Sequence, residues 1–177
     1  MESKKVCVPL LSREQIAAAV GRLAAELNRD YRRKHPLVIG ILKGCYVFMA
    51  DLTRQLEMPV EIDFARLSSY GPGTETSGKV RVISSPRIDI KGRDVIVLED
   101  IIDTGLTVKC FLKYLQRRQP ASVKVCALAD KPARRRVAVS IDYLGFIVPD
   151  RFLVGYGLDC DEKYRNLPDI CALEDSV

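Results

Sequence analysis

The chain has 177 residues, of which 47% are hydrophobic and 29% are charged, with a net charge of +5. This length and composition predict one soluble globular domain with a substantial core, so that no second domain is needed. The apolar runs are shorter than the roughly 20 residues of a membrane span, and the N-terminus lacks the apolar core of a signal peptide. We therefore expect a cytoplasmic protein without membrane contact.

The cysteine and histidine content argues against several kinds of site. The six cysteines are scattered without a C-x-x-C pair, and His35 is the only histidine. This pattern predicts reduced cysteines that pack in the interior, and it leaves serine or cysteine triads without an obvious base. Any metal would be held by oxygen atoms. The mild positive charge suits anionic small molecules and weak nucleic-acid binding equally.

The first part of the chain predicts a helix followed by a buried strand. Ser12 to Gln15 form a capping box, and apolar residues then recur at helical spacing until Pro36. Leu37–Leu42 is expected to be a fully buried strand of the parallel type. Lys43-Gly44 follows at its carboxyl end, where it is either a ligand-binding turn or an ordinary glycine turn before the next helix.

The segment 60–84 predicts two strands around an excursion. Val60 to Leu67 alternates apolar and polar residues, and Lys79 to Ser84 returns as a strand. Between them, Ser68 to Gly78 is rich in glycine and hydroxyl residues, so it is either a hairpin connection or an active-site lid. Tyr70 at its root favours the lid.

The stretch from Val95 to Lys109 carries the strongest chemical signal. A buried strand is predicted over 95–98, and it leads into three carboxylates and then a helix whose first turn offers phosphate-binding N–H groups and two hydroxyls: Glu99, Asp100, Asp103, Thr104, Gly105, Leu106 and Thr107. The carboxylates would bind ribose hydroxyls, hold a divalent cation such as Mg²⁺, or exchange a proton. The alternative is a surface turn with a stabilising acidic first turn.

The rest of the chain completes an α/β pattern. A helix is expected from Val108 to about Pro120, and Val123 to Ala129 is a further buried strand. Alternation of strands and helices predicts a mostly parallel twisted sheet flanked by helices. After Val137 the short β-like pieces have no helix between them, so they would form a sheet edge or a small cap. The run Arg134 to Arg136 is typical of a solvated turn.

These residues carry a resemblance to a known family. The stretch 98–105 resembles the phosphoribosyl pyrophosphate (PRPP) motif of type I phosphoribosyltransferases, and the chain is similar to the hypoxanthine-guanine phosphoribosyltransferases in further segments, in the family's order along nearly its whole length: Leu42 to Gly44 with Ala50 to Leu52, Ser69-Tyr70, Lys131, Pro149 to Asp159, and Tyr164 to Leu167. The resemblance implies one domain over 1–177 with a type I fold, a mobile lid over 68–78 including Ser69 and Tyr70, and a hood over roughly 137–177 joined by the N-terminal residues.

The resemblance also implies roles for individual residues on the PRPP side. Residues 103–107 would hold the 5′-phosphate, and Glu99 and Asp100 would meet the ribose hydroxyls. Lys43, Gly44 and Arg165 would bind pyrophosphate, through a Lys43-Gly44 peptide that family members often hold cis. Mg²⁺ would be held by a set of three carboxylates: Glu99, Asp100 and Asp159.

On the purine side, Lys131, Phe152, Leu153 and Asp159 would bind the base, and Asp103 would be the general base at N7. A lysine has three donors and no acceptor, so Lys131 favours 6-oxopurines over adenine. The implied reaction converts hypoxanthine or guanine and PRPP into IMP or GMP and pyrophosphate, and the implied assembly is a homodimer or homotetramer.

Some features depart from the family, and other functions stay open. Leu106 stands where some relatives carry lysine, and Cys160 where relatives often carry an aromatic residue. A relative that prefers xanthine or adenine is one alternative. A PRPP-sensing regulator that binds nucleic acid is another, although no helix-turn-helix extension is visible and no nucleic acid is expected. A Mg²⁺-dependent flavodoxin-like domain is the default without the resemblance, but the chain has neither a P-loop nor a G-x-G-x-x-G motif.

Overall fold

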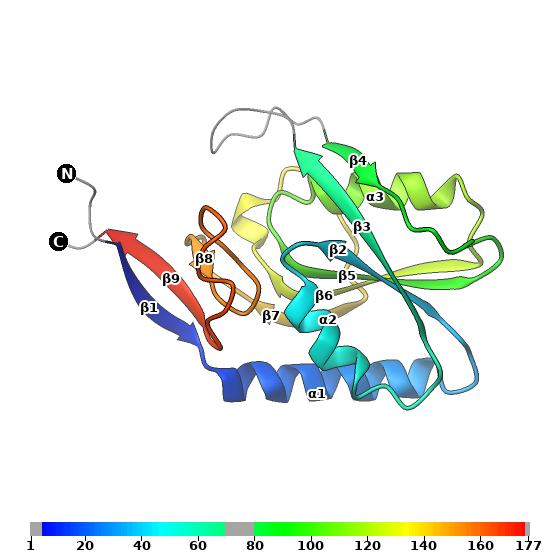
Figure 1. The fold of residues 1–177 in the computed structure, drawn as a ribbon, viewed down its shortest axis with the longest axis horizontal. Coiled ribbons are helices and arrows are strands. Elements are labelled where there is room, and N and C mark those ends of the chain that lie inside the picture. The colour runs from blue at the N-terminus through cyan, green and yellow to red at the C-terminus, as the bar shows by residue number, and fades with distance from the viewer. Residues whose placement is uncertain (1–4, 70–79, 176–177) are drawn as a thin grey trace.

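The structure is a computed structural model that describes residues 5–69 and 80–175, with two sheets and three α-helices in these ranges. Figure 1 shows the larger sheet beside the helices and the smaller sheet beyond one end of α1. The elements in chain order are β1 Lys5–Leu11, α1 Arg13–Asp30, β2 Leu37–Leu42, α2 Tyr46–Thr53, β3 Glu61–Ser69, β4 Val80–Ser84, β5 Asp94–Ile102, α3 Leu106–Gln116, β6 Ser122–Asp130, the 3₁₀ turn Pro132–Arg134, β7 Tyr143–Ile147, β8 Leu153–Val154 and β9 Ile170–Asp175.

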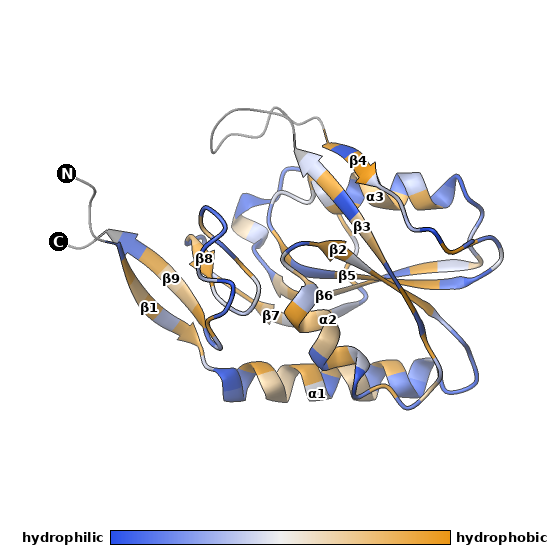
Figure 2. Cartoon of the chain, viewed as in Figure 1, coloured by the Kyte–Doolittle hydropathy of each residue, from blue (hydrophilic) through white to orange (hydrophobic). Residues whose placement is uncertain are grey.

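The larger sheet confirms the expected mostly parallel α/β fold. Its strand order is β4-β3-β2-β5-β6-β7, and all neighbours pair in parallel except β3 with β4. Strands that are buried on both faces consist of nearly continuous apolar residues, as β2 and much of β5 do here. Figure 2 shows these two strands largely in the colours of apolar residues, whereas α1 alternates between polar and apolar.

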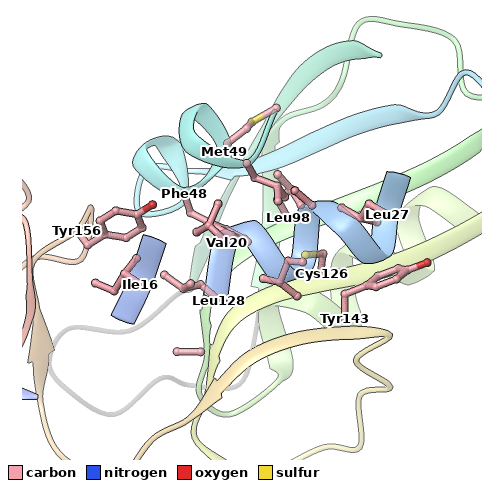
Figure 3. Packing of buried hydrophobic residues seen from close by; sticks show 14 of the residues in the cluster. Ile16, Val20, Leu27, Phe48, Met49, Leu98, Cys126, Leu128, Tyr143 and Tyr156 are labelled. Atoms are coloured by element: carbon pink, nitrogen blue, oxygen red, sulfur yellow. The ribbon is translucent and has the colours of Figure 1, made fainter. Parts of the chain in front are cut away.

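Side-chain alternation along β5 separates the core into two layers. Ile96 and Leu98 face α1 and α2, while Val95 and Val97 face α3. Figure 3 shows the first layer, in which Phe48 of α2 and Val20 of α1 lie beside Leu98. The period of two in a strand therefore gives both helix layers a matching apolar surface.

Helix α1 follows the predicted capping box. The Ser12 hydroxyl accepts from the Gln15 backbone N–H, and the Gln15 side chain accepts from the Ser12 backbone N–H. Such a cap contributes about 1 kcal/mol, and the buried face with Leu23 and Leu27 supplies the larger part of the helix's stability.

Strand β5 is longer than the sequence suggested. It does not end at Leu98 but continues to Ile102, because β6 keeps pairing with it through Glu99 opposite Ala127 and Ile101 opposite Ala129. Glu99 and Asp100 are consequently part of the strand, and both are buried. The carboxylates thus belong to the sheet itself rather than to an exposed loop.

The smaller sheet has the antiparallel order β1-β9-β8. It joins the N-terminal strand to the last part of the chain, which fits the hood that the resemblance implied. Of the short pieces expected after Val137 to form a sheet edge or a small cap, β7 pairs in parallel with β6 and forms an edge of the larger sheet, whereas β8 joins the smaller sheet. A short edge strand without a following helix carries no local sign of which sheet it joins.

Several smaller expectations can be compared with the structure. All six cysteines lie within the described ranges and are free, and His35 is exposed. None of the described helices has the length and apolar character to span a membrane. Of the expected lid over 68–78, Ser68 and Ser69 belong to the end of β3, whereas Tyr70 and the rest of it lie outside the described residues.

Candidate active site

A cavity of about 600 Å³ opens at the carboxyl ends of the parallel strands. Ligands bind at this edge in open α/β sheets because the loops after neighbouring strands meet there. The loop after β2, the end of β5, the turn after β6 and the hood all contribute to the wall, and most predicted site residues line it: Lys43, Gly44, Asp100, Asp103, Thr107, Lys131, Phe152, Leu153, Asp159 and Arg165.

The turn into α3 forms a second, smaller hollow of about 70 Å³. It is lined by Glu99 together with the loop residues Asp103, Thr104, Gly105 and Thr107. Gly105 has φ +81°, and a Cβ there would lie 2.8 Å from the Val137 carbonyl oxygen, so only glycine fits without strain. The first N–H groups of α3 face no helical carbonyl and can therefore bind an anion.

Glu99 and Asp100 form a buried acidic pair beside this hollow. Burial raises the pKa of Glu99 well above its usual range, and the neighbouring Asp100 carboxylate raises it further. Burial also raises the pKa of Asp100, to about 6, against the opposing effect of the Ile101 N–H that donates to it at 2.9 Å. Glu99 Oε2 accepts from no described residue, which leaves it free for a hydroxyl or cation of a ligand.

The loop after β2 packs tightly against this pair. A Cβ on Gly44 would lie 1.7 Å from Asp100 Oδ2, so the close approach of backbone and carboxylate requires glycine. A cis peptide bond joins Leu42 to Lys43, one residue before the Lys43-Gly44 bond for which the resemblance implied that form. That implication was wrong by one residue.

Two cations, Lys43 and Arg165, line the same cavity. The Lys43 ammonium is 2.9 Å from Glu162 Oε2. Arg165 reaches in from the hood, with Nη2 2.9 Å from Asp159 Oδ1 and Nη1 donating to the Gly157 carbonyl at 2.8 Å. Arg165 Nε is buried and donates to none of the described residues. Lys43 and Arg165 are thus both held by carboxylates of the loop after β8.

Phe152 and Lys131 form another part of the cavity wall, which suits a flat ring. The Phe152 ring is 52% exposed, which is unusual for a large apolar side chain and leaves a face free for stacking. Lys131 is only 5% exposed and donates to the Arg151 carbonyl at 2.7 Å. Burial lowers the pKa of Lys131, while the nearby Asp103 and Asp150 favour its charged form. Two of its three donors remain for a ligand.

Arg134 is a site residue that the sequence did not indicate. It lines the cavity, its Nε lies 3.2 Å from Asp103 Oδ1, and its Nη1 lies 3.8 Å from Asp150 Oδ1. The following Arg135 pairs with Asp130. The run 134–136 was taken as a solvated turn, and the signal against that interpretation was its position directly after Lys131 at the end of a buried strand.

Comparison with known proteins identifies the family. A family model of the phosphoribosyl transferase domain matches residues 10–161. The hypoxanthine-guanine phosphoribosyltransferase of Bacillus subtilis is 45% identical over 168 residues, covering 95% of this chain and 93% of that protein. The chain belongs to the hypoxanthine-guanine phosphoribosyltransferase family.

Solved members of this phosphoribosyltransferase family share the fold. A hypoxanthine-guanine phosphoribosyltransferase from Bacillus anthracis matches with a TM-score of 0.89 and 43% identity, covering 97% of this chain and 99% of that one. The chain also matches the bifunctional TilS/HprT protein of Listeria innocua at 44% identity, but it spans only 26% of that protein's length.

The metal-binding set that the resemblance implied is not assembled as a cage. Within residues 5–69 and 80–175, no three histidine, cysteine, aspartate or glutamate side chains converge as metal ligands. Asp100 and Asp159 both line the cavity, whereas Glu99 lines the smaller hollow at the α3 turn. This arrangement suits Mg²⁺, which usually binds through one or two carboxylates together with substrate oxygens.

Proposed function

We propose that this phosphoribosyltransferase transfers the 5-phosphoribosyl group from PRPP to N9 of hypoxanthine or guanine, giving IMP or GMP and pyrophosphate. The observation that carries the proposal is a cavity with two chemically distinct ends, together with the smaller hollow at the α3 turn that shares Asp103 and Thr107 with it. An anion-binding turn, a cationic pair, and an exposed aromatic ring beside a buried lysine match the phosphate, the pyrophosphate and the purine of the two substrates.

The PRPP side of the proposal rests on the buried acids and the α3 turn. Residues 103–107 would hold the 5′-phosphate through backbone N–H groups and two hydroxyls, because Leu106 supplies no charge. Glu99 and Asp100 would accept hydrogen bonds from the ribose hydroxyls, which satisfies an otherwise orphaned buried oxygen. Lys43, Gly44 and Arg165 would bind the pyrophosphate.

Mg²⁺ fits this site as a bound cofactor. Asp100 and Asp159 are the carboxylates that line the cavity, so they are the residues that would hold the ion directly or through water. When bound, Mg²⁺ would neutralise negative charge on the departing pyrophosphate. The same neutralisation is supplied from the protein side by Lys43 and Arg165.

The chemical step needs orientation and one proton transfer. As N9 of the purine forms its bond to the anomeric carbon, the bond from that carbon to pyrophosphate breaks, and the N7 proton passes to Asp103. The oxocarbenium-like transition state requires no protein nucleophile, which agrees with the lack of a catalytic triad in the sequence. Arg134, whose Nε lies 3.2 Å from Asp103 Oδ1, would orient the carboxylate that acts as general base.

The purine side of the proposal predicts a preference among bases. Phe152 would stack on the ring, backbone groups of Leu153 would meet its edge, and Lys131 would donate to the 6-oxo group. Adenine presents a donor at that position, so it would leave the buried ammonium without an acceptor from the ligand.

A panel of four bases tests the function. Hypoxanthine, guanine, xanthine and adenine are each supplied with PRPP and Mg²⁺, and nucleotide formation is followed by absorbance. Hypoxanthine and guanine should turn over at least tenfold faster than adenine. Preference for xanthine or adenine would contradict the base assignment, and PRPP binding without turnover of any base would contradict the enzyme itself.

We also propose that the chain forms a homo-oligomer through the open face of β3. Tyr46 at the start of α2 and Ile62 and Phe64 on β3 are large, apolar and exposed. Phe64 lies beside Gly40 of β2, next to α2, so the exposed residues are grouped around one side of the sheet. Exposed apolar groups of this kind are typical of protein interfaces.

Light scattering after size exclusion tests the assembly. Phe64→Glu should shift the protein towards monomer. Ile147→Glu is the matched control, because Ile147 is 72% exposed but lies on β7, at the opposite edge of the sheet. An equal shift in both variants, or no shift in either, would contradict the β3 interface.

A further inference from the structure

Glu162 occupies the cationic end of the cavity. Its Oε2 lies 2.9 Å from the Lys43 ammonium and 3.2 Å from Arg165 Nη2, so one carboxylate oxygen bridges both cations. The Glu162 side chain is 63% exposed, and its backbone N–H donates to Asp159 Oδ2 at 2.9 Å. It belongs to a tight loop in which Asp161, Glu162 and Tyr164 all have positive φ.

The two cations that Glu162 bridges come from different parts of the chain. Lys43 follows β2, whereas Arg165 and Glu162 belong to the loop after the hood strand β8. Lys43 and Arg165 together lower the pKa of Glu162, Lys43 more strongly, so the carboxylate is charged at neutral pH. Arg165 Nε remains buried without an acceptor among the described residues. The arginine is thus only partly satisfied by the protein's own carboxylates.

We propose that Glu162 is an internal competitor of pyrophosphate that sets the affinity of the site for PRPP and for the leaving group. The proposal rests on the function proposed above, in which Lys43 and Arg165 bind the pyrophosphate. A phosphoryl oxygen and a carboxylate oxygen seek the same donors, so the two anions cannot both use them. PRPP must displace Glu162 on entry, and Glu162 recovers both cations as pyrophosphate leaves.

The size of the effect follows from the exposure of the ion pair. Exposed ion pairs contribute little free energy. A pair at the upper end of the usual range of free energies would keep Glu162 bound to the two cations a few times more often than released from them. The apparent affinity falls by the fraction of molecules that are competent to bind. Removing the carboxylate should therefore tighten pyrophosphate binding by about three- to sixfold.

Calorimetric titration of the full-length protein with magnesium pyrophosphate tests the proposal on Glu162→Gln. The expected result is about three- to sixfold tighter binding of pyrophosphate and a similar fall in the KM for PRPP. The affinity for IMP, which has no pyrophosphate, should stay unchanged. Glu162→Ala also removes the hydrogen bonds that a glutamine side chain could still accept, so it should tighten pyrophosphate binding at least as much. Glu26→Gln is the control, because Glu26 pairs with Arg22 on α1, away from the cavity lining.

Weaker or unchanged pyrophosphate binding in Glu162→Gln would overturn the proposal, because a carboxylate that merely orients the cations would help the ligand. An equal change in IMP affinity would overturn it as well. Lys43→Ala separates this failure from failure of the proposed site: if Lys43→Ala leaves pyrophosphate affinity intact, the pyrophosphate assignment itself is wrong. In the double variant Lys43→Ala/Glu162→Gln, the gain from Glu162→Gln should shrink.

Discussion

Replacement of Lys131 by methionine tests the purine end of the site most directly. The substitution keeps the length of the buried stem and removes the ammonium, which is 5% exposed and already gives one hydrogen bond to the Arg151 carbonyl at 2.7 Å. The bond proposed to the 6-oxo group is charge-assisted, and such bonds contribute about 1.5 to 3 kcal/mol. We therefore expect kcat/KM for hypoxanthine and guanine to fall by about 10- to 150-fold.

The loss should be confined to 6-oxopurines. The KM for PRPP and the affinity for pyrophosphate should change by less than about threefold, because Lys43 and Arg165 lie at the other end of the cavity. The relative use of adenine should rise, because its amino group no longer meets an ammonium. Lys124→Met, on the exposed part of β6, the strand that precedes Lys131, is the control. An equal loss of purine and PRPP binding would refute the reasoning, since it would mean that Lys131 only supports the wall at Arg151.

Three further predictions concern two acidic residues and the metal. Asp103→Asn should lower kcat by about 10²- to 10⁴-fold with little change in PRPP affinity, and an unchanged kcat would exclude it as general base. Asp100→Asn should raise the melting temperature of the protein without ligand at pH 8. The pKa of this buried carboxyl is raised to about 6, so its ionisation at pH 8 costs up to about 3 kcal/mol of folding stability. A lower melting temperature would show that the hydrogen bond from the Ile101 N–H matters more. Chelation of Mg²⁺ should abolish turnover and reduce the thermal stabilisation by PRPP, both restored by added Mg²⁺, and turnover in excess chelator would contradict the cofactor.

The sequence predicted those parts of the fold whose causes are local. The capping box at Ser12, the apolar runs of β2 and β5 and the glycine at position 105 each express a short-range constraint, and each lies where it was expected. Parallel strands place their carboxyl ends at the same edge of a sheet. Because Lys43, Asp103 and Lys131 each follow such a strand, the sequence predicts that all three lie at that edge. Their convergence on one cavity follows from topology alone.

The remaining features depend on contacts between distant segments. Whether Glu99 ends a strand or continues it is decided by its pairing with Ala127 of β6, which no local pattern encodes. The pairing of β7 with the larger sheet is of the same kind. Arg134 and Glu162 resemble any exposed charged residues in the sequence, and only the folded chain shows that each lies against a residue of the site.

These long-range ion pairs change how binding to the site should be understood. In the structure Arg134 lies against Asp103, and Glu162 against Lys43 and Arg165, so the cavity partly neutralises its own charges. Under the proposed function, substrate binding is an exchange of partners, and the gain in free energy is the difference between two sets of ion pairs rather than the full attraction of one. Such an exchange lets a site bind a highly charged substrate specifically and still release a highly charged product. For the buried Glu99–Asp100 pair, Arg165 offsets only part of the effect of burial on Asp100, and the pKa values of both carboxyls stay raised.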